Sequence, residues 1–393
     1  MFYIRLNFIN VAEIVKKQIV KFAPKGTDSF YDTVKERVNE YFVVNNISPY
    51  SNRHMYIKTA AMLSMYFVPY LVVVTGLGAF NLWFFYALWL LMGLGIVGIG
   101  TSVMHDSNHG AYAENKNVNN FLGSVLNILG GYSLNWKIQH NILHHTFTNI
   151  EGLDEDIEAG AFLRMTPEKP LKGFYRYQHI YAWFLYCLMN LYWIVAKDYV
   201  MLFRYHKSDM LVKQKTTLRK SLIELSLLKV VYAAYIIVLP IMFSGVAWYH
   251  VVLGLVAMHV VAGFSLACIF QPAHVVETSD YSAPSDDRKM ENNWAVHQVM
   301  NTADFAPNNK LVCWFIGGLN FQIEHHLFPQ ICHVHYPKIA KIVEAVANEY
   351  DIPYQVMPTF RSALVAHGKM LKKLGRNEDH IYELKKPRAA ATA

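Results

Sequence analysis

Histidine is the residue type whose spacing in this sequence is best suited to chemistry. The stretch HNILHHTFTN, residues 140–149, holds three histidines within six residues. HDSNHG at 105–110 and NFQIEHHLFP at 320–329 hold two each, and FQPAHVV at 270–276 holds one. Because an unpaired buried imidazole is costly, such clustering indicates a ligand that compensates for its burial.

The spacing within these stretches favours metal coordination. His105 and His109, and likewise His140 and His144, are four residues apart, which places both rings of each pair on one face of a helix. His145 is rotated by about 100° from His144 and can reach a neighbouring ion. Imidazoles without thiolates suit zinc, copper, iron or nickel.

The remaining candidate ligands lie later in the chain. His325 and His326 are adjacent, Gln322 precedes them by one turn on the same side, and His274 stands alone. Taken singly, each has a plainer interpretation, such as a hydrogen-bonded interfacial histidine at position 274. Eight imidazoles are too many for one ion and fit two. Two metal ions beside a lipid phase indicate redox chemistry on an alkyl chain, for which an iron pair can activate dioxygen.

The elements that must position these histidines are apolar helices. Hydrophobic residues make up 53% of the 393 residues and charged residues 17%, which is typical of a membrane protein. Uncharged or nearly uncharged stretches at 59–75, 82–104, 222–243 and 247–270 approach the ~20 residues that cross a bilayer. We therefore expect an all-α integral membrane protein whose four transmembrane helices form two hairpins, 59–104 and 222–270.

The distribution of basic residues predicts the orientation. Residues 1–58 hold 9 Lys and Arg, and residues 105–221 and 271–393 hold 13 each. By the positive-inside tendency these three segments face the cytoplasm, so both termini and all the histidine stretches share that side in a helical cytosolic cap. The net charge of +7 suits anionic membrane lipid or an acidic protein partner. Nucleic acid is not expected as a partner.

Other segments bear on this topology. Residues 179–203 are apolar enough to cross as a fifth span, but their aromatic, Asn, Lys and Asp residues favour an interfacial helix that lies on the membrane. Residues 121–132 are too few to cross. The start of the chain, 1–20, reads as an amphipathic lead-in and residues 384–393 as a disordered tail. The four cysteines are scattered and predict no disulfide framework.

In this order and context, HDSNH, HNILHH and QIEHH resemble the histidine boxes of the membrane fatty acid desaturases. Gln322 in the third box is similar to the front-end and linoleoyl-CoA desaturase-like branch, and the resemblance runs from about residue 104 to 337. It implies a single desaturase domain with a non-haem di-iron centre. The implied ligands are His105, His109, His140, His144, His145, His274, His325 and His326, with Gln322 as a possible ninth. Asp154 and Asp156 resemble the family's acidic pair, which orients ligand imidazoles; solvated loop charges are the alternative.

The resemblance also implies the reaction. Two hydrogens are removed from neighbouring methylenes of a long acyl chain to form a cis double bond, with dioxygen, two electrons and two protons consumed and two waters released. The acyl carrier, CoA or phospholipid or carrier protein, and the position of the bond stay open. Many front-end enzymes carry a fused cytochrome b5 domain with a His-Pro-Gly-Gly motif, which this sequence lacks. We therefore expect a separate ferredoxin or cytochrome b5 as electron donor.

Three alternatives share part of this pattern. A hydroxylase or ketolase of the same superfamily has the same boxes, a metal transporter would line its spans with histidines, and a metal-stabilised scaffold would show no turnover.

The motif GLGIVGIG at 93–100 matches a dinucleotide fingerprint but lies in an apolar span, so helix packing explains it better. His259, His297, His333 and His335 are interpreted as hydrogen-bonding or surface residues rather than ligands.

Overall fold

The computed structural model describes residues 20–24, 26 and 29–378. Within these residues the chain is mostly helical, and its two-stranded sheet pairs β1 (Asp304–Phe305) with β2 (Val356–Met357) in parallel. The predicted disordered tail lies outside the described residues, as does the amphipathic lead-in up to residue 19. The all-α fold expected from the sequence is confirmed.

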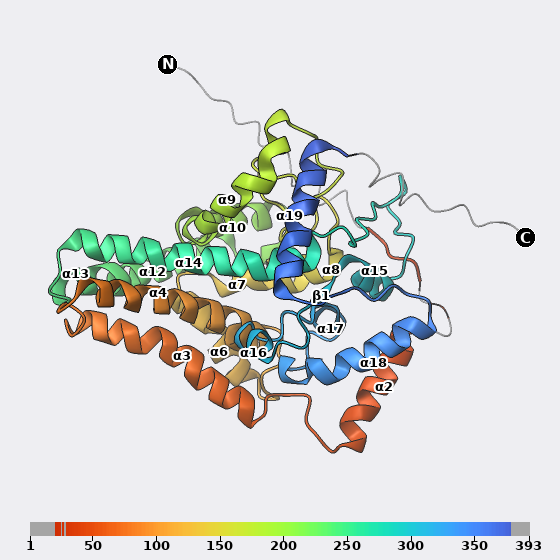
Figure 1. Cartoon of the computed structure of the whole chain (residues 1–393), viewed down its shortest axis with the longest axis horizontal. Helices are drawn as coiled ribbons and strands as arrows, with labels where there is room; N and C mark the ends of the chain where they lie inside the picture. Colours follow the sequence, from red (N-terminus) through yellow and green to blue (C-terminus); the bar gives the residue numbers. More distant parts are fainter. Residues whose placement is uncertain (1–19, 25, 27–28, 379–393) are drawn as a thin grey trace, which may run out of the picture.

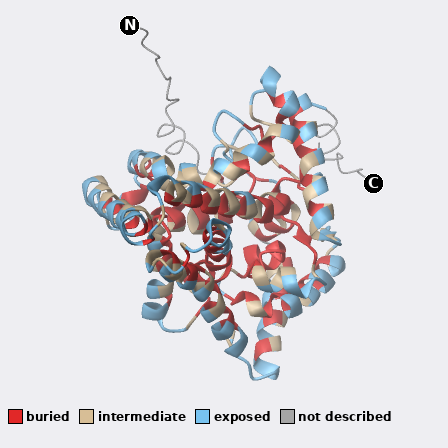
Figure 2. Cartoon of the chain, turned by 60° about the vertical axis from the view of Figure 1, so that its left-hand side comes forward, coloured by how far each residue is buried: buried red, intermediate tan, exposed pale blue. Residues whose placement is uncertain are grey.

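In the part of the chain that the structure describes, five helical stretches are long and apolar enough to cross a membrane. Four contain the apolar stretches expected from the sequence, and Figure 1 shows them extending together to one side of the molecule. They are α3 (Arg53–Val74); α4 (Leu82–Gly98) with η1 (Ile99–Val103) and α5 (Met104–Asn108); α12 (Leu218–Ala233) with η5 (Ala234–Val238) and α13 (Leu239–Phe243); and α14 (Trp248–His274). Their outward faces are exposed and their facing sides buried, as in Figure 2, which is the pattern expected of helices surrounded by lipid.

The fifth stretch, Gly173–Lys207, comprises η3 (Gly173–Tyr177), α9 (Gln178–Tyr192), η4 (Trp193–Lys197) and α10 (Asp198–Lys207). Near its start, Gln178 Nε2 donates to the carbonyl oxygen of Arg164 at 2.9 Å. Near its end, Arg204 Nη1 donates to Glu155 Oε1 at 3.1 Å. Both ends of this long stretch therefore contact the same short loop, residues 155–164.

Glycines in α4 allow its neighbours to approach closely. A Cβ on Gly93 would lie 2.6 Å from the carbonyl oxygen of Met258, and one on Gly95 would lie 2.8 Å from the backbone nitrogen of Tyr66. Gly98 is equally tight against a side chain of α3. The prediction that glycines in GLGIVGIG serve helix packing rather than dinucleotide binding is confirmed at these three positions.

A polar core holds the long helices together. His259, in the middle of α14, accepts from Asn190 Nδ2 at 2.9 Å through Nδ1, and its Nε2 lies 2.7 Å from the hydroxyl of Tyr232. The expectation that His259 is hydrogen-bonded within the bundle is confirmed. Lys229 is paired with Asp198 at 2.8 Å, because the two long stretches that carry them pack together.

A cap of shorter elements covers one end of the long helices (Figure 1). It contains α2 (Phe30–Val44), α6 (Lys116–Ile128), α7 (Ser133–Trp136), η2 (Lys137–His144), α8 (His145–Phe147), α11 (Met210–Lys213), α15 (Trp294–Asn301), α16 (Lys310–Phe315), α17 (Gln322–Leu327), η6 (His333–His335), α18 (Tyr336–Glu349) and α19 (Phe360–Arg376). Buried apolar residues of α2, α15, α17 and α18 form one core, so α17 is clamped between the outer helices and the long bundle.

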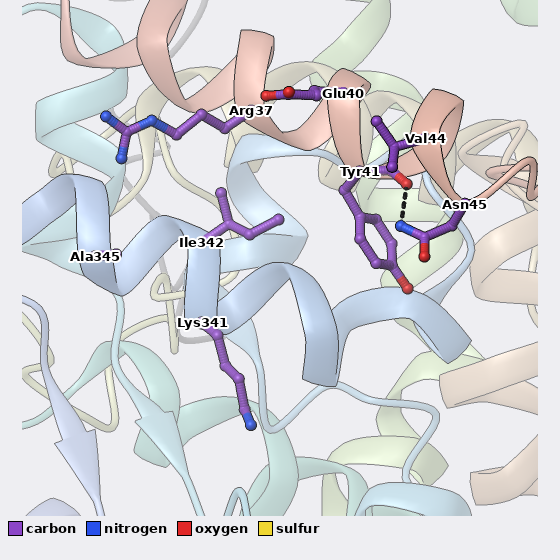
Figure 3. Close-up of a pocket in the computed structure, with 8 residues that line it drawn as sticks. All are labelled: Arg37, Glu40, Tyr41, Val44, Asn45, Lys341, Ile342 and Ala345. Atoms are coloured by element: carbon purple, nitrogen blue, oxygen red, sulfur yellow. Dashed lines mark hydrogen bonds between the residues drawn. The ribbon is translucent and has the colours of Figure 1, made fainter.

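The outer helices α2 and α18 lie side by side at the edge of this cap. Arg37 forms a two-pronged ion pair with Glu349, with both N–O distances 2.6 Å. A shallow groove opens between them, lined by Tyr41, Ile342 and neighbouring residues (Figure 3). Because the ion pair is exposed, apolar packing rather than charge supplies most of this contact.

The close crossing of α9 and α14 gives a test of the packing. A Cβ on Gly263 would lie 2.8 Å from the carbonyl oxygen of Tyr186, so Gly263→Val must push the helices apart. We expect the free energy of unfolding to fall by about 1–3 kcal/mol, measured as a lower melting temperature in detergent. Gly173→Ala is the matched control, because nothing lies within 4 Å of its added Cβ. Equal melting temperatures for the two variants would contradict the close crossing.

Candidate metal centre

Four separate parts of the chain carry the candidate histidines to one place. His105 and His109 follow η1 at the end of the second long helix, and His140, His144 and His145 lie in and directly after η2. Both η1 and η2 are π-helical, a wider helix that is frequent at functional sites. His274 ends α14, and His325 and His326 lie in α17. All are buried except His109, which is partly exposed.

Two groups of ring nitrogens result. Within each group, every residue offers one ligand atom, and these atoms lie within 4.8 Å of one another. The first group is His105, His109, His140 and His325, and the second is His144, His274 and His326. In the first group, Nε2 of His105 and Nε2 of His140 are 3.2 Å apart, which is within hydrogen-bonding distance.

His145 lies between the two groups. Its ring centroid is 4.8 Å from that of His109 and 4.6 Å from that of His325 in the first group, and 4.4 Å from that of His326 in the second. Both of its ring nitrogens are buried and have no hydrogen-bond partner. The eight imidazoles predicted from the sequence therefore form one continuous cluster.

The chemistry of this cluster fits bound metal. Buried ring nitrogens without a partner occur throughout it, and these are Nδ1 of His105, His145 and His274 and Nε2 of His109, His144, His145, His274, His325 and His326. Leaving so many acceptors unpaired in a buried place is costly, whereas a metal ion would satisfy several of them at once. Neutral imidazole is the donor that suits first-row transition ions. The buried clusters are thus consistent with a metal site.

The two aspartates singled out in the sequence lie against imidazoles. His140 Nδ1 donates to Asp156 Oδ2 at 3.1 Å, and His144 Nδ1 donates to Asp154 Oδ1 at 3.0 Å. Asp154 also accepts from the backbone N–H of Asn149 at 2.8 Å, which fixes the carboxylate. Because Nδ1 donates its proton to an aspartate in both histidines, Nε2 is the atom whose lone pair can bind a metal ion. The aspartates are not solvated loop charges.

The electrostatics of this pair favour a positive charge at His144. Burial lowers the pKa of His144, but the negative charges of Asp154 and Asp156 outweigh it and raise this pKa to about 9. Burial dominates at His140, where the pKa falls to about 3 although Asp156 opposes the fall. Burial also lowers the pKa of His145 and of His326 far below the usual value. A metal cation at Nε2 of His144 would take the place of the second ring proton, while the Nδ1 proton stays on the hydrogen bond to Asp154.

The sequence analysis missed several residues that orient the histidines of the cluster. His326 Nδ1 donates to Gln298 Oε1 at 2.7 Å, and His325 Nδ1 lies 3.3 Å from the hydroxyl oxygen of Tyr336. Trp294 Nε1 donates to the carbonyl oxygen of His145 at 3.0 Å. These partners come from α15 and α18, and no local motif in the sequence distinguishes them from packing residues.

A second chain of polar groups lies behind His105. Lys58 Nζ donates to His333 Nε2 at 2.7 Å, and His333 Nδ1 donates to Asp106 Oδ2 at 2.8 Å. The other oxygen of Asp106 is 3.7 Å from His105 Nδ1. His333 is therefore a hydrogen-bonding residue, as expected, but it is buried rather than on the surface. The carboxylate next to His105 was the available signal, since Asp106 follows it directly.

Two buried carboxyl groups hold the third histidine stretch. The hydroxyl of Tyr354 contacts both Asp304 Oδ2 at 2.8 Å and Glu324 Oε1 at 2.9 Å, and Asp304 Oδ1 accepts from the backbone N–H of Ile323 at 3.1 Å. Burial raises the pKa of Glu324 well above its usual value and that of Asp304 to about 6. A protonated Glu324 then lets the two carboxyl groups share this site, which ties α17 to β1.

The other histidines discussed in the sequence are not part of the cluster. His297 contacts the carbonyl oxygen of Thr148 at 2.8 Å, and His335 contacts that of Tyr50 at 3.0 Å. Both are therefore hydrogen-bonding residues, as expected. Gln322 is buried one turn before His326, and its amide nitrogen has no partner. Rotation of that amide by half a turn would present its oxygen instead.

An apolar cavity of about 630 Å³ adjoins the cluster. Its wall at the metal-site end includes Trp136 and His140, and its remaining walls come from the helix of η1, from α9 and η4, and from α14. Most of its lining is apolar, but Glu155, Glu158 and Arg204 border it near Asp156. This volume is in the range of pockets that enclose small organic ligands.

Comparison with known proteins identifies the class. The family model described as fatty acid desaturase matches residues 81–358. The chain is 37% identical over 350 residues to the sn-1 linoleoyl-lipid 6-desaturase of Arthrospira platensis, a match that covers 89% of this chain and 94% of the relative. It is also 37% identical over 366 residues to the acyl-lipid (8-3)-desaturase of Physcomitrium patens, covering 92% of this chain and 75% of the relative.

A third relative, the sn-1 linoleoyl-lipid 6-desaturase of a Synechocystis strain, is 32% identical over 366 residues, which cover 91% of this chain and 98% of the relative. The chain therefore belongs to the fatty acid desaturase family. It is an enzyme that desaturates fatty acyl chains, and the resemblance seen in its histidine boxes is confirmed.

The aspartate beneath His144 provides a test of the metal centre. Asp154→Asn keeps the size of the side chain but removes the charge that orients and polarises the imidazole, so we expect metal affinity to fall by about 10–100-fold. The measurement is metal retained per protein, by elemental analysis, during dialysis against a graded chelator. Asp286→Asn, at an exposed position, is the control. Identical retention curves for the two variants would show that Asp154 does not support a bound ion.

Proposed function

We propose that the histidine cluster binds two iron ions and that these are the site of acyl desaturation. The first ion is held by His105, His109, His140 and His325, the second by His144, His274 and His326, with His145 between them and Gln322 as a further ligand. The proposal is supported by the separation of the ring nitrogens into two groups and by their lack of other partners. Bound iron supplies the dioxygen activation that removal of hydrogen from an unactivated methylene requires.

The protein's own contribution is to orient ligands and hold the chain. Asp154 and Asp156 keep the Nδ1 protons of His144 and His140 in place, so that Nε2 faces the metal space. The cavity beside His140 holds the acyl chain in an apolar enclosure and keeps water from the reacting carbons. Trp136 borders both the cavity and the rings of His105 and His140, so it positions the chain at the metal level.

The substrate we propose is an acyl chain still esterified to a membrane lipid. Among the residues that border the cavity, Phe162, Leu188, Tyr192 and Val200 are exposed on its outer side. An apolar outer wall of this kind opens toward lipid tails rather than toward water. The relatives named as acyl-lipid or lipid-linked desaturases support the same choice over a soluble CoA ester.

The orientation we propose has four crossings, with the metal centre and both termini on the cytoplasmic side. The three segments richest in Lys and Arg then share one side. Gly173–Lys207 does not cross in this scheme, and the contacts of both its ends with the loop 155–164 support a return to the side from which it started. Electrons come from a separate acidic carrier, a ferredoxin or a cytochrome b5, which the charge of +7 would attract.

One observation carries this proposal: eight imidazoles cluster in a fatty acid desaturase, seven of them have a buried ring nitrogen without a hydrogen-bond partner, and the eighth, His140, borders an apolar cavity. Its test is expression in a host of known lipid composition, followed by mass spectrometry of fatty acids from each lipid class. A new cis double bond that appears first in intact membrane lipids is the expected result. A hydroxy acid would assign the enzyme to hydroxylation, and a first appearance in acyl-CoA would overturn the lipid-linked substrate.

The ligand assignment has its own test in His144→Ala. We expect this variant to insert normally, to lose measurable desaturation and to bind less iron, because the second group keeps only two of its three histidines. Iron per protein and membrane content are measured together. His250→Ala is the control, since His250 contacts Tyr86 far from the cluster. Turnover retained by His144→Ala at the wild-type level would contradict its role as a ligand.

A further inference from the structure

The fourth glycine of GLGIVGIG differs from the other three. Added Cβ atoms at Gly93, Gly95 and Gly98 would collide with neighbouring helices. A Cβ at Gly100 would meet only Leu266, at 3.8 Å, which is an ordinary van der Waals contact. Helix packing therefore does not require a glycine at position 100. Gly100 instead borders the apolar cavity, as Leu266 does.

Gly100 belongs to a stripe along one helix face. Ile96, Gly100 and Met104 are spaced by four residues, and all three border the cavity. Met104 directly precedes His105, so it marks the level of the metal centre. Ile96 lies further along the helix, at the other end of this stripe. The cavity thus extends from the metal centre toward the bundle interior, and Gly100 is the position in this stripe where no side chain narrows it.

The opposite end of the cavity is polar and lies close to the metal centre. Asp156 contacts His140, while its neighbour Glu155 is paired with Arg204 at the rim. Glu155 and Asp156 are consecutive residues, whose Cα atoms are about 3.8 Å apart. The polar rim formed by Glu155 and Arg204 is therefore close to His140, which Asp156 contacts. An acyl chain with its polar end at this rim reaches the metal centre after a few carbons, and the rest of the chain continues past Met104.

We propose that Gly100 sets the length of acyl chain that the enzyme accepts, by leaving room for the methyl end beyond the metal centre. The proposal deepens the proposed desaturation and rests on it. It assigns the two ends of the cavity different tasks: the polar rim fixes the distance from the ester to the reacting carbons, and the stripe of Ile96, Gly100 and Met104 fixes the length beyond them. A larger residue at position 100 shortens only the second part.

The experiment compares Gly100→Ala and Gly100→Leu with the wild type in cells supplied with saturated and monounsaturated chains that differ in steps of two carbons. Conversion of each chain and the position of each new double bond are measured by mass spectrometry. Leu94→Phe is the control, because it enlarges a lipid-facing side chain of the same helix that does not border the cavity. Protein in the membrane and bound iron are quantified for every variant.

We expect Gly100→Leu to lower conversion of the longest accepted chain by about 10-fold or more relative to the chain two carbons shorter, with Gly100→Ala intermediate. The new double bond should keep its distance from the carboxyl carbon, because the rim is unchanged. Leu94→Phe should match the wild type.

Three results would overturn the inference. An unchanged length preference would show that the methyl end does not pass Gly100. A double bond displaced relative to the carboxyl carbon would show that the methyl end, not the rim, sets the register. If conversion fell equally for acyl chains of every length in both Gly100 variants, with iron retained, Gly100 would have a role other than setting the accepted chain length. A wild type that forms no double bond in any chain would instead refute the proposed function itself.

Discussion

The structure depends on one constraint: eight imidazoles from four separate parts of the chain must be buried together without hydrogen-bond partners for most of their Nε2 atoms. The folding free energy of the long helices has to compensate for this cost until metal satisfies it. The surrounding elements are arranged accordingly. The glycines of α4 allow α3 and α14 to pack closely against it, and His105 and His274 lie at the ends of two of these long helical stretches.

Carboxylates on two sides of the cluster stabilise the buried imidazoles in different ways. Asp154 and Asp156 face the second histidine stretch directly and hold Nδ1 protons, while Asp106 connects His105 to the buried pair of His333 and Lys58. The negative charges thus lie around the cluster, where they fix the Nδ1 protons of the imidazoles and favour a positive charge at His144.

In the proposed function, the apolar cavity holds the acyl chain and the histidine cluster holds the metal ions, and the two share a wall. His140 borders both, and Met104 in the cavity wall precedes His105 in the chain. Because the reacting carbon has no functional group to bind, its position must come from the shape of the cavity and from the polar end of the substrate. The proposed role of Gly100 follows from this, because Gly100 borders the cavity without belonging to the histidine cluster.

The sequence by itself determined the apolar helices, the eight histidines and the family, because hydropathy over about twenty residues and four-residue spacing on a helix are local properties. It also indicated Asp154 and Asp156, which lie near their partners in the chain. Only the tertiary structure decided which imidazoles share a group, that His333 supports Asp106 across 227 residues, and that Gly100 borders a cavity while Gly93 packs against a helix. Those contacts join distant segments, so they depend on how the helices pack, which no local pattern encodes.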